Sequence, residues 1–528
     1  MSRLRSPVSV RPTPVAGVLV FTLALGLRVW GIGFGLPELY HPDEPAYVLQ
    51  ALAVARGLPD GLTFADPPLF KYVLLGEDVV LYGWQRLVGA VASPQGFVDR
   101  FRADPSQLYL SARLTSAVFG ATTALAAGGL AQHLAGRRAA LLAAGLTAIT
   151  FLLVRDAHFG VDDALVSLLV ALGLIFCARV VAGGSRRDYL AAGALSGLAF
   201  AAKYDGIALL VPLTVAHVVR RGRRSHREAL LALAACLVAS VVAFPSLVTE
   251  PGRVVNDVYL HLYLAASGGY DGLDPAGGYV FYARALVTGL GWPLLLAGVA
   301  GLLLGVARRQ MSSVVVASLP IALLAVLGSQ QLYFARFALP ALPPLIVGAA
   351  LLLDSLMSIQ LGVGLLASAL VAMPPLVDTV RFDALLTRVD TRALARDWVA
   401  ADLPLTASIA VDAPPLGPRL DSDAPRQVLV ADAWSLFDLT PAEYRARGVE
   451  YVVVSSFTSE AHAIDPLREA RRLAFPSALA ANGAVVAQFR PYTGASQPPF
   501  VYDQIYAPFN ALDQLEAPGP TITVYRLR

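Results

Sequence analysis

The sequence predicts an all-α polytopic membrane domain followed by a small C-terminal α/β domain. Of the 528 residues, 56% are hydrophobic and only 15% are charged, and the mean hydropathy is +0.60. Soluble globular domains carry about 25% charged residues, so the composition excludes an ordinary soluble enzyme. Apolar runs recur up to residue 378, after which the composition changes to that of a soluble domain.

Apolar runs near the length of a transmembrane helix, roughly 20 residues, occur about eleven times. They lie at 14–33, 107–131, 138–155, 162–182, 188–202, 204–219, 228–248, 280–306, 312–328, 333–353 and 360–378. Lys203 and Asp205 separate the fifth run from the sixth, which predicts either one broken hairpin or two short helices. Cys177 and Cys236 lie inside apolar runs and indicate no disulfide framework.

The basic loops predict an orientation in the membrane. Cytoplasmic loops are enriched in Lys and Arg. If the N-terminus is inside, the strongly basic short loops all fall on the inner side, at 136–140, 183–188, 220–228 and 307–310. An odd number of spans then places the C-terminal domain outside. Together with the compact loops, this predicts a multi-pass protein of the plasma (inner) membrane, with a cytoplasmic N-terminus and an extracytoplasmic C-terminal domain.

Two domains are predicted, a transmembrane domain at 1–378 and a soluble domain at 379–528. The transmembrane domain carries two long outer loops, 34–106 and 249–279. The soluble domain alternates strand-like and helical runs, as expected for a small α/β unit. Its strand-like runs are 426–434, 449–457 and 521–528, and its helical runs are 390–403 and 440–448.

Ionisable residues beside membrane spans are candidates for function because they are costly there. On the predicted outer side they are His41, Asp43, Glu44, Asp66, Lys71, Arg113, Arg155, His158, Asp162, Asp163, Lys203, Asp205 and Arg336. The inner side carries mainly arginine without paired acids. This asymmetry predicts an active site on the outer face, at the depth of the lipid headgroups.

The first acidic motif is HPDEPAYVLQALAVARG, residues 41–57. Asp43 or Glu44 is suited to cap a helix that starts at Pro45, since proline is favoured in the first turn. The same two carboxylates are suited to act as a general base, as metal ligands, or as both. The sequence alone leaves both interpretations open.

The second acidic motif is RDAHFGVDDALVSLL, residues 155–169. One of Asp162 and Asp163 is expected to begin the fourth span, which leaves the other free for function. His158 is either a polar contact at headgroup level or a metal ligand.

Three cations on the same predicted face have two interpretations. Lys203 and Arg336 are either anchors that reach the membrane interface or ligands of a phosphate group. Arg113 lies inside the second span, where it needs a carboxylate partner such as Asp163 or Glu44.

These motifs together resemble one family. In chain order they are the acid pair at 43–44, PPL at 67–69, ARLTS at 112–116, the aspartate before the fourth span, GLAFAAKYDG at 197–206 and FARFALPALPPL at 334–345. A further motif, DTRALARDWV, follows the last span. The set is similar to GT-C type glycosyltransferases of the protein mannosyltransferase and aminoarabinose transferase group, glycosyltransferase family 39.

The resemblance implies transfer of a sugar from a polyprenyl-phosphate donor to an acceptor hydroxyl on the non-cytoplasmic side. It implies Asp43 as catalytic base with Glu44 beside it, and Asp163, or else Asp162, as the second acid. It places Lys203 and Arg336, with Arg113, near the donor phosphate, and leaves His41, His158 and Asp162 as possible metal or supporting residues. Oxygen-rich acidic clusters also suit Mg or Mn, so the need for a divalent cation stays open.

The expected partners are a polyprenyl-phosphate-linked sugar, a protein, lipid or glycan acceptor, and membrane lipids. A net charge of +3 does not suggest a nucleic acid. Whether the sugar is a hexose such as mannose or a pentose stays open, as does the choice between protein glycosylation and modification of a lipid or cell-wall glycan. A transporter or flippase for lipid-linked sugars is the alternative of another class, but its polar residues should line a path through the span midpoints.

Overall fold

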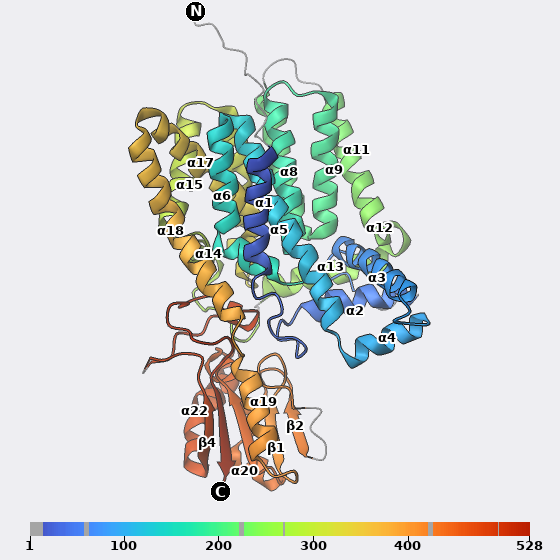
Figure 1. Cartoon of the computed structure of the whole chain (residues 1–528), viewed down its shortest axis with the longest axis vertical. Helices are drawn as coiled ribbons and strands as arrows, with labels where there is room; N and C mark the ends of the chain where they lie inside the picture. Colours follow the sequence, from blue (N-terminus) through green and yellow to red (C-terminus); the bar gives the residue numbers. More distant parts are fainter. Residues whose placement is uncertain (1–13, 57–62, 221–225, 268–269, 421–425, 495) are drawn as a thin grey trace, which may run out of the picture.

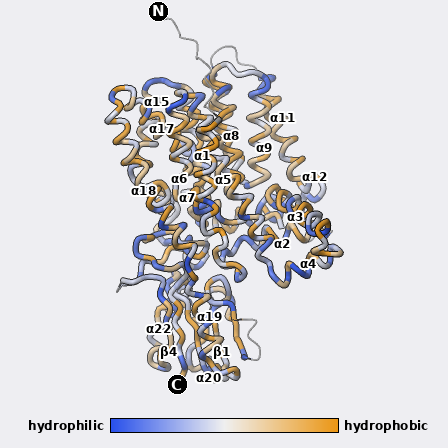
Figure 2. The backbone as a smooth tube through the Cα atoms, viewed as in Figure 1, coloured by the Kyte–Doolittle hydropathy of each residue, from blue (hydrophilic) through white to orange (hydrophobic). Residues whose placement is uncertain are grey.

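The computed structural model describes residues 14–56, 63–220, 226–267, 270–420, 426–494 and 496–528. Figure 1 shows a helical bundle with the C-terminal domain beneath one end. The bundle is coloured mainly as hydrophobic in Figure 2, whereas the C-terminal domain is mixed. The predicted fold class, a polytopic helical domain with a small α/β domain, is confirmed.

The bundle is built from apolar helices that run along its long axis (Figure 1). They include α1 (Pro14–Val29), α5 (Ser106–Ala135), α6 (Arg137–Ile149), α8 (Asp163–Val181), α9 (Arg186–Ala202), α10 (Leu210–Val219), α11 (His226–Ala243), α15 (Trp292–Ala307), α16 (Met311–Gly328), α17 (Leu342–Ile359) and α18 (Leu361–Leu386). Within the described ranges, six helices are long and apolar enough to cross a membrane, or up to eight if each of two bent pairs is one span. The predicted number of about eleven spans is therefore not confirmed.

Two predicted spans are broken helices. The run at 280–306 forms α14 (Gly278–Leu290) and α15, which are bent by 106°. Gly291 lies at the break with φ +75°, and a Cβ there would lie 2.9 Å from Pro374 Cβ, so the bend needs a glycine. The apolar run predicted at 280–306 is therefore a bent pair of helices, either one broken span or a re-entrant loop. The run at 138–155 likewise divides into α6 and α7 (Phe151–Arg155), with a bend of 62°.

The two predicted outer loops form short helices beside the end of the bundle that adjoins the C-terminal domain (Figure 1). The first contains α2 (Glu44–Ala55), α3 (Leu69–Leu87) and α4 (Pro94–Ala103). The second contains the end of α12 (Ser246–Thr249) and the whole of α13 (Pro251–Ser267). The backbone N–H of Phe64 donates to Asp257 of α13 at 2.9 Å, which joins the two loops. Helix α3 buries Phe70 and exposes Trp84, as expected for a helix that lies in the membrane interface.

The C-terminal domain contains a five-stranded sheet of order β2-β1-β3-β5-β4. The strands are β1 (Ser408–Asp412), β2 (Gln427–Ala431), β3 (Tyr451–Ser455), β4 (Gly483–Phe489) and β5 (Ile522–Leu527). Strand β1 pairs in parallel with β2 and β3, and β5 is antiparallel to both β3 and β4. The predicted strand-like and helical runs of the tail all form the expected elements, and β1 and β4 are additional.

Helices cover both faces of this sheet. Alternate residues of β1 point to opposite faces, and each face packs against different helices. Ile409 packs in a cluster with Ala395 of α19 (Thr391–Asp402). Ala410 packs in a second cluster with Phe475 of α22 (Pro466–Asn482) and Tyr444 of α20 (Pro441–Ala446). The last bundle helix, α18, continues past the predicted domain boundary at 378 and ends at Leu386.

Candidate active site

Asp43 lies at the N-terminus of α2, where it occupies the N-cap position. Its side chain makes no capping hydrogen bond. Instead, its Oδ2 lies 2.9 Å from Arg336 Nη2, and the carboxylate keeps 35% of its surface exposed. Capping is therefore not the role of this side chain. Pro45 supplies the helical φ for the start of α2, so the acid is free to point toward the bundle.

Asp162 and Asp163 lie at the start of α8 and share one cation. Lys203, the residue that follows α9, forms an ion pair with Asp163, and its Nζ lies 3.5 Å from Asp162 Oδ1. Both carboxylates are buried, and Asp162 Oδ2 has no hydrogen-bond partner among the described residues. Two buried acids beside one ammonium leave negative charge that a further cation can neutralise.

Arg336 joins the two acidic motifs. Its Nε lies 4.0 Å from Asp163 Oδ2, on the other side of that carboxylate from Lys203, while its Nη2 pairs with Asp43. The result is a continuous sequence of alternating charges, the charge row, made by Asp162, Lys203, Asp163, Arg336 and Asp43. The four segments that supply these residues are far apart in the chain, so the fold has gathered them at one site.

The charge row lies next to a cavity of about 430 Å³. Asp66, Lys203 and Asp205 line its charged end, whereas most of its remaining lining is apolar and comes from α10, α13, α16 and the segments 204–208 and 330–337. Four of the apolar residues in its wall are exposed: Ile207, Val211, Leu262 and Val326. A cavity with a charged end and an apolar remainder suits a ligand that has an ionised head and a hydrocarbon tail.

Glu44 is adjacent to Asp43 but has a different environment. It is fully buried, and its two oxygens accept hydrogen bonds from Arg113 Nε at 2.7 Å and Nη2 at 2.6 Å. It also accepts the backbone N–H of Gly160 at 2.8 Å. Arg113 Nη1 donates to the carbonyls of Ile32 and Phe34, both at 2.7 Å.

This pair connects the first loop to α5 and to the loop before α8. The predicted phosphate-binding role of Arg113 is not supported, because its guanidinium is bonded to Glu44 and to two carbonyls. The catalytic role expected for Glu44 is not supported either, because both of its oxygens are held by buried donors. The pair instead fixes the position of Asp43, the residue next to Glu44.

Loss of the Arg113 side chain should destabilise the fold strongly. Arg113→Met leaves the Glu44 carboxylate buried without its partner, at an expected cost of about 3–5 kcal/mol in the free energy of unfolding. Thermal unfolding of the purified protein measures this. Arg102→Met is the matched control, because its ion pair with Asp99 is exposed and is worth at most about 1 kcal/mol. The double variant with Glu44→Gln should regain part of the loss, and equal unfolding of Arg113→Met and the control would contradict the role of the pair.

The two histidines expected near the site differ in position. His41 stacks on Phe159 with 4.4 Å between ring centroids, and its Nδ1 accepts the Asp43 backbone N–H at 3.3 Å. Burial, and secondarily the cations of Arg336 and its neighbours, lowers the pKa of His41 well below its usual value, so the ring is neutral. His41 therefore supports the loop.

His158 is not part of the charge row. Its ring nitrogens lie 2.9 Å from the Val154 carbonyl and 3.1 Å from the Trp30 carbonyl, between α7 and the end of α1. Its Nε2 also lies 3.5 Å from Asp383 of α18. With both nitrogens occupied in the core, the possible role as a metal ligand is not supported.

The C-terminal domain supplies part of the site, which sequence reasoning did not identify. The Tyr506 hydroxyl lies 3.3 Å from Arg336 Nη2, and the ring centroid lies 4.1 Å from the guanidinium carbon. Tyr506 also faces His41 with 5.2 Å between ring centroids. The aromatic ring thus holds Arg336 between the membrane domain and the C-terminal domain.

Arg155 anchors the segment that carries Tyr506. Its guanidinium donates to the backbone carbonyls of Asp503 at 2.6 Å and of Ala507 and Pro508, both at 3.3 Å. Asp503 accepts the backbone N–H of Ala335, the residue before Arg336, at 2.9 Å. The only sequence signal for this contact was Arg155 itself, an ionisable residue that begins the second acidic motif beside a membrane span.

Burial raises the pKa of Asp43, and the positive charge of Arg336 opposes that shift. A carboxylate with a raised pKa is a stronger base than a free one, provided that it is ionised. Arg336 keeps the ionised form accessible. The site thus combines a base, Asp43, with a cation, Arg336, that is able to interact with a further anion as well.

The described residues do not fit a divalent cation in this arrangement. Among them, no group of three or more His, Cys, Asp or Glu side chains is positioned to hold a metal ion. Lys203 and Arg336 lie between the carboxylates of the charge row. These two side chains already supply positive charge at the site.

The fold and this site define a class, the multi-pass membrane proteins with a GT-C glycosyltransferase fold. ArnT from Cupriavidus metallidurans, solved bound to undecaprenyl phosphate, is 16% identical with a TM-score of 0.55, over 97% of this chain and 98% of that chain. The oligosaccharyltransferase from Archaeoglobus fulgidus, in its apo form, is 14% identical with a TM-score of 0.52, over 93% and 76%. At such identities the likeness establishes the fold.

The family comparison adds a sequence relationship. Residues 106–248 match the sequence model of the dolichyl-phosphate-mannose-protein mannosyltransferase family. This range contains Arg113, the second acidic motif and Lys203. No curated protein sequence matches the chain. The resemblance to GT-C glycosyltransferases of the family 39 type, predicted from the motifs, is confirmed.

Proposed function

We propose that this protein is an integral membrane glycosyltransferase that moves a sugar from a polyprenyl-phosphate donor to an acceptor hydroxyl. The observation that carries the proposal is the charge row at the charged end of a largely apolar cavity of about 430 Å³. The ArnT structure contains undecaprenyl phosphate, and an archaeal oligosaccharyltransferase structure, 14% identical with a TM-score of 0.51, contains dolichol-phosphate. Both ligands have the chemistry that this cavity suits.

In the proposed reaction Asp43 is the general base. The acceptor hydroxyl attacks the anomeric carbon of the sugar and loses its proton to the Asp43 carboxylate. The bond between the anomeric carbon and the phosphate oxygen breaks, and both of its electrons leave with the polyprenyl phosphate. Asp43 is suited to this role because its carboxylate is partly exposed and pairs with Arg336 at one end of the charge row.

Lys203 and Arg336 stabilise the leaving phosphate. Negative charge grows on the phosphate oxygen as the glycosidic bond breaks, and fixed cations in a site with little water stabilise such charge strongly. Asp163 lies between the two cations and sets their separation. Lys203 also lines the cavity itself, so it is the cation nearest to the proposed lipid tail.

The pH dependence of transfer should report the Asp43 carboxylate. Because burial raises its pKa, activity should fall on acidification at a pH above the usual aspartate pKa of about 3.9. The loss follows from protonation of the base, so activity returns as the pH rises through that pKa. A profile of kcat against pH in proteoliposomes measures this. The residual activity of Asp43→Asn should not show this fall at acidic pH. If the fall is unchanged in that variant, another group causes it.

We propose that the two cations replace a divalent metal in this reaction. Incubation with EDTA, followed by assay without added Mg or Mn, should then leave the transfer rate within about twofold of the untreated enzyme. Restoration of a lost activity by one of these metals would contradict this proposal and would return the acidic residues to the role of ligands.

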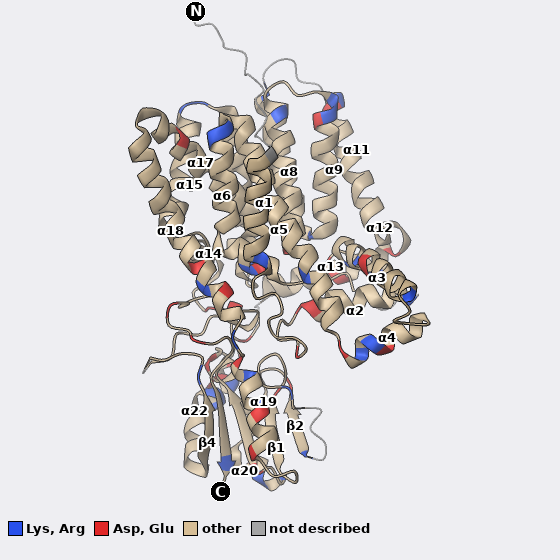
Figure 3. Cartoon of the chain, in the orientation of Figure 1, with Lys and Arg blue, Asp and Glu red and all other residues tan. Residues whose placement is uncertain are grey.

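The proposed setting is the plasma membrane, with the charge row on the non-cytoplasmic side. Figure 3 shows a set of Lys and Arg residues at the end of the bundle that faces away from the C-terminal domain. That end contains the starts of α6 and α9, where Arg137 and Arg186 lie. Two variants, Ser312→Cys in the bundle and Ser435→Cys in the C-terminal domain, test which end of the protein lies outside the cell. In intact cells only Ser435→Cys should react with an impermeant thiol reagent.

The test of the proposed function is a transfer assay with a radiolabelled polyprenyl-phosphate sugar. Purified protein in proteoliposomes is offered hexose and pentose donors with protein, lipid and glycan acceptors. Label should move to one acceptor class in wild-type vesicles and stay with the donor when Asp43→Asn and Asp163→Asn are combined. Movement of intact labelled lipid across the bilayer without transfer would instead support a transporter.

A further inference from the structure

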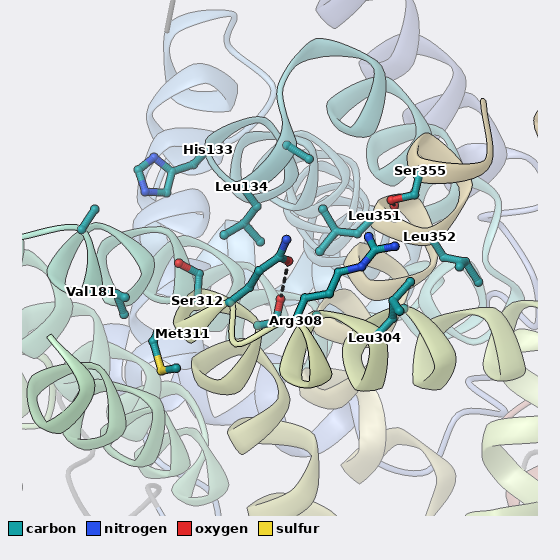
Figure 4. A pocket seen from close by; sticks show the side chains of 16 residues that line it. His133, Leu134, Val181, Leu304, Arg308, Met311, Ser312, Leu351, Leu352 and Ser355 are labelled. Atoms are coloured by element: carbon teal, nitrogen blue, oxygen red, sulfur yellow. Dashed lines mark hydrogen bonds between the residues drawn. The ribbon is translucent and has the colours of Figure 1, made fainter. Parts of the chain in front are cut away.

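A second cavity lies at the opposite end of the bundle from the charge row. Its volume is about 370 Å³, and its lining comes from the ends of α5, α8, α15, α16 and α17. Figure 4 shows this cavity with the side chains that line it. No step of the proposed transfer uses these residues, so the cavity needs a separate explanation.

One wall of this cavity is polar and positively charged. Its polar residues are His133, Arg308, Gln310, Ser312, Ser313 and Ser355. None of the described residues in the lining is acidic. Figure 4 shows the Arg308 side chain extended across the cavity toward Ser355. Within the described part of the chain, the Arg308 guanidinium has no hydrogen bond or ion pair.

The rest of the lining is apolar and lacks side chains that can fill the space. Leu134, Leu304 and Leu351 contribute apolar surface. Gly301 and Gly305 belong to the same lining, and a Cβ on Gly301 would lie 1.9 Å from the Gly348 carbonyl oxygen. At this position α15 lies directly against α17, so the wall is backbone that cannot rotate into the cavity.

The position of the cavity relates it to the membrane surface. Apolar helices end here, and Figure 3 shows Lys and Arg residues at the same end. Arg and Lys at the ends of membrane helices lie at the depth of lipid headgroups, and basic pockets between such helices bind anionic lipids. A ligand here would have its charge at Arg308 and apolar atoms against the leucines.

We propose that this cavity binds the phosphate-bearing headgroup of an anionic membrane phospholipid, with Arg308 as the phosphate ligand. Arginine matches a phosphate in bidentate fashion, and the hydroxyls of Ser312 and Ser355 are placed to donate to the remaining oxygens. The glycerol and the first acyl carbons would lie against Leu304 and Leu351. This site is independent of the proposed transferase site and would couple the bundle to the composition of the surrounding leaflet.

The test is lipid retention by the full-length protein in nanodiscs of phosphatidylcholine and phosphatidylglycerol in equal amounts. Native mass spectrometry should find phosphatidylglycerol enriched on the wild-type protein. Arg308→Gln should reduce this enrichment about tenfold, the usual effect of losing one charge-assisted hydrogen bond. Arg309→Gln is the matched control. It removes the same charge at the next residue, whose side chain is not part of the cavity lining.

Two further arms keep the result decisive. Ser312→Phe should fill the cavity and abolish the enrichment with all charges retained, while the temperature of unfolding in detergent verifies that each variant is folded. Inorganic phosphate at millimolar concentration should not displace the lipid. Equal enrichment on the wild-type protein and Arg308→Gln would overturn the proposal, as would stabilisation by inorganic phosphate without any preference between the two lipids.

Discussion

Replacement of Asp43 by asparagine is expected to lower kcat for sugar transfer by about 10²–10⁴-fold, the usual contribution of a general base. Asparagine keeps the size of the side chain and can still accept from Arg336, but it cannot take the acceptor proton. The Michaelis constant for the donor should change much less than kcat, because the phosphate-binding cations stay in place. Initial rates with a radiolabelled donor in proteoliposomes measure both.

The control for this variant is Glu38→Gln, in the same loop. Glu38 pairs with Arg396 of the C-terminal domain and lies outside the charge row, so transfer should stay near the wild-type rate. Asp43→Glu, which restores a carboxylate with a longer reach, should recover part of the rate. Normal transfer by a folded Asp43→Asn protein would show that this residue is not the base.

Replacement of Lys203 by glutamine is expected to lower kcat by about 10²–10³-fold, as when one donor to a developing oxyanion is removed. Donor binding should weaken as well, because Lys203 lines the charged end of the cavity. The loss also leaves Asp162 and Asp163 without their shared cation, so a folded state must be verified by thermal unfolding. Steady-state rates at varied donor concentration separate the two effects.

Two further variants distinguish a specific role from a general loss of charge. Arg284→Gln, which removes an exposed cation paired with Asp274, should leave transfer unchanged. Lys203→Arg keeps the charge and should retain more activity than Lys203→Gln. If the glutamine and arginine variants lose the same activity, the position requires the shape of lysine and the proposed stabilisation of the phosphate charge is not supported.

The sequence predicted most of the charge row because its members lie within short motifs at the ends of apolar runs. Charges are costly in such places, so Asp43, Asp163, Lys203 and Arg336 were among thirteen candidates, and the family resemblance then assigned roles to these four. The structure adds that they are consecutive neighbours in space. It also resolves the choice between Asp162 and Asp163 in part, since only Asp163 lies near both cations.

Glu44 illustrates why local sequence was insufficient. Asp43 and Glu44 are adjacent and chemically alike, so the motif gave them the same expected role. At the start of a helix, consecutive side chains point in directions about 100° apart, because a turn takes 3.6 residues. Asp43 therefore faces Arg336, and Glu44 is directed into the bundle against Arg113.

By itself the sequence determined the class of protein, a membrane bundle with a soluble α/β tail. It also located the apolar runs and the ionisable residues beside them, which are costly to place near lipid and are therefore candidates for function. These follow from the transfer of apolar and charged groups between water and lipid, which depends on each short segment alone. The tertiary structure decided the partners. Tyr506 meets Arg336 from 170 residues away, and Arg155 meets Pro508 from 353 residues away. Such contacts depend on how the domains pack, and no local pattern in the chain encodes them.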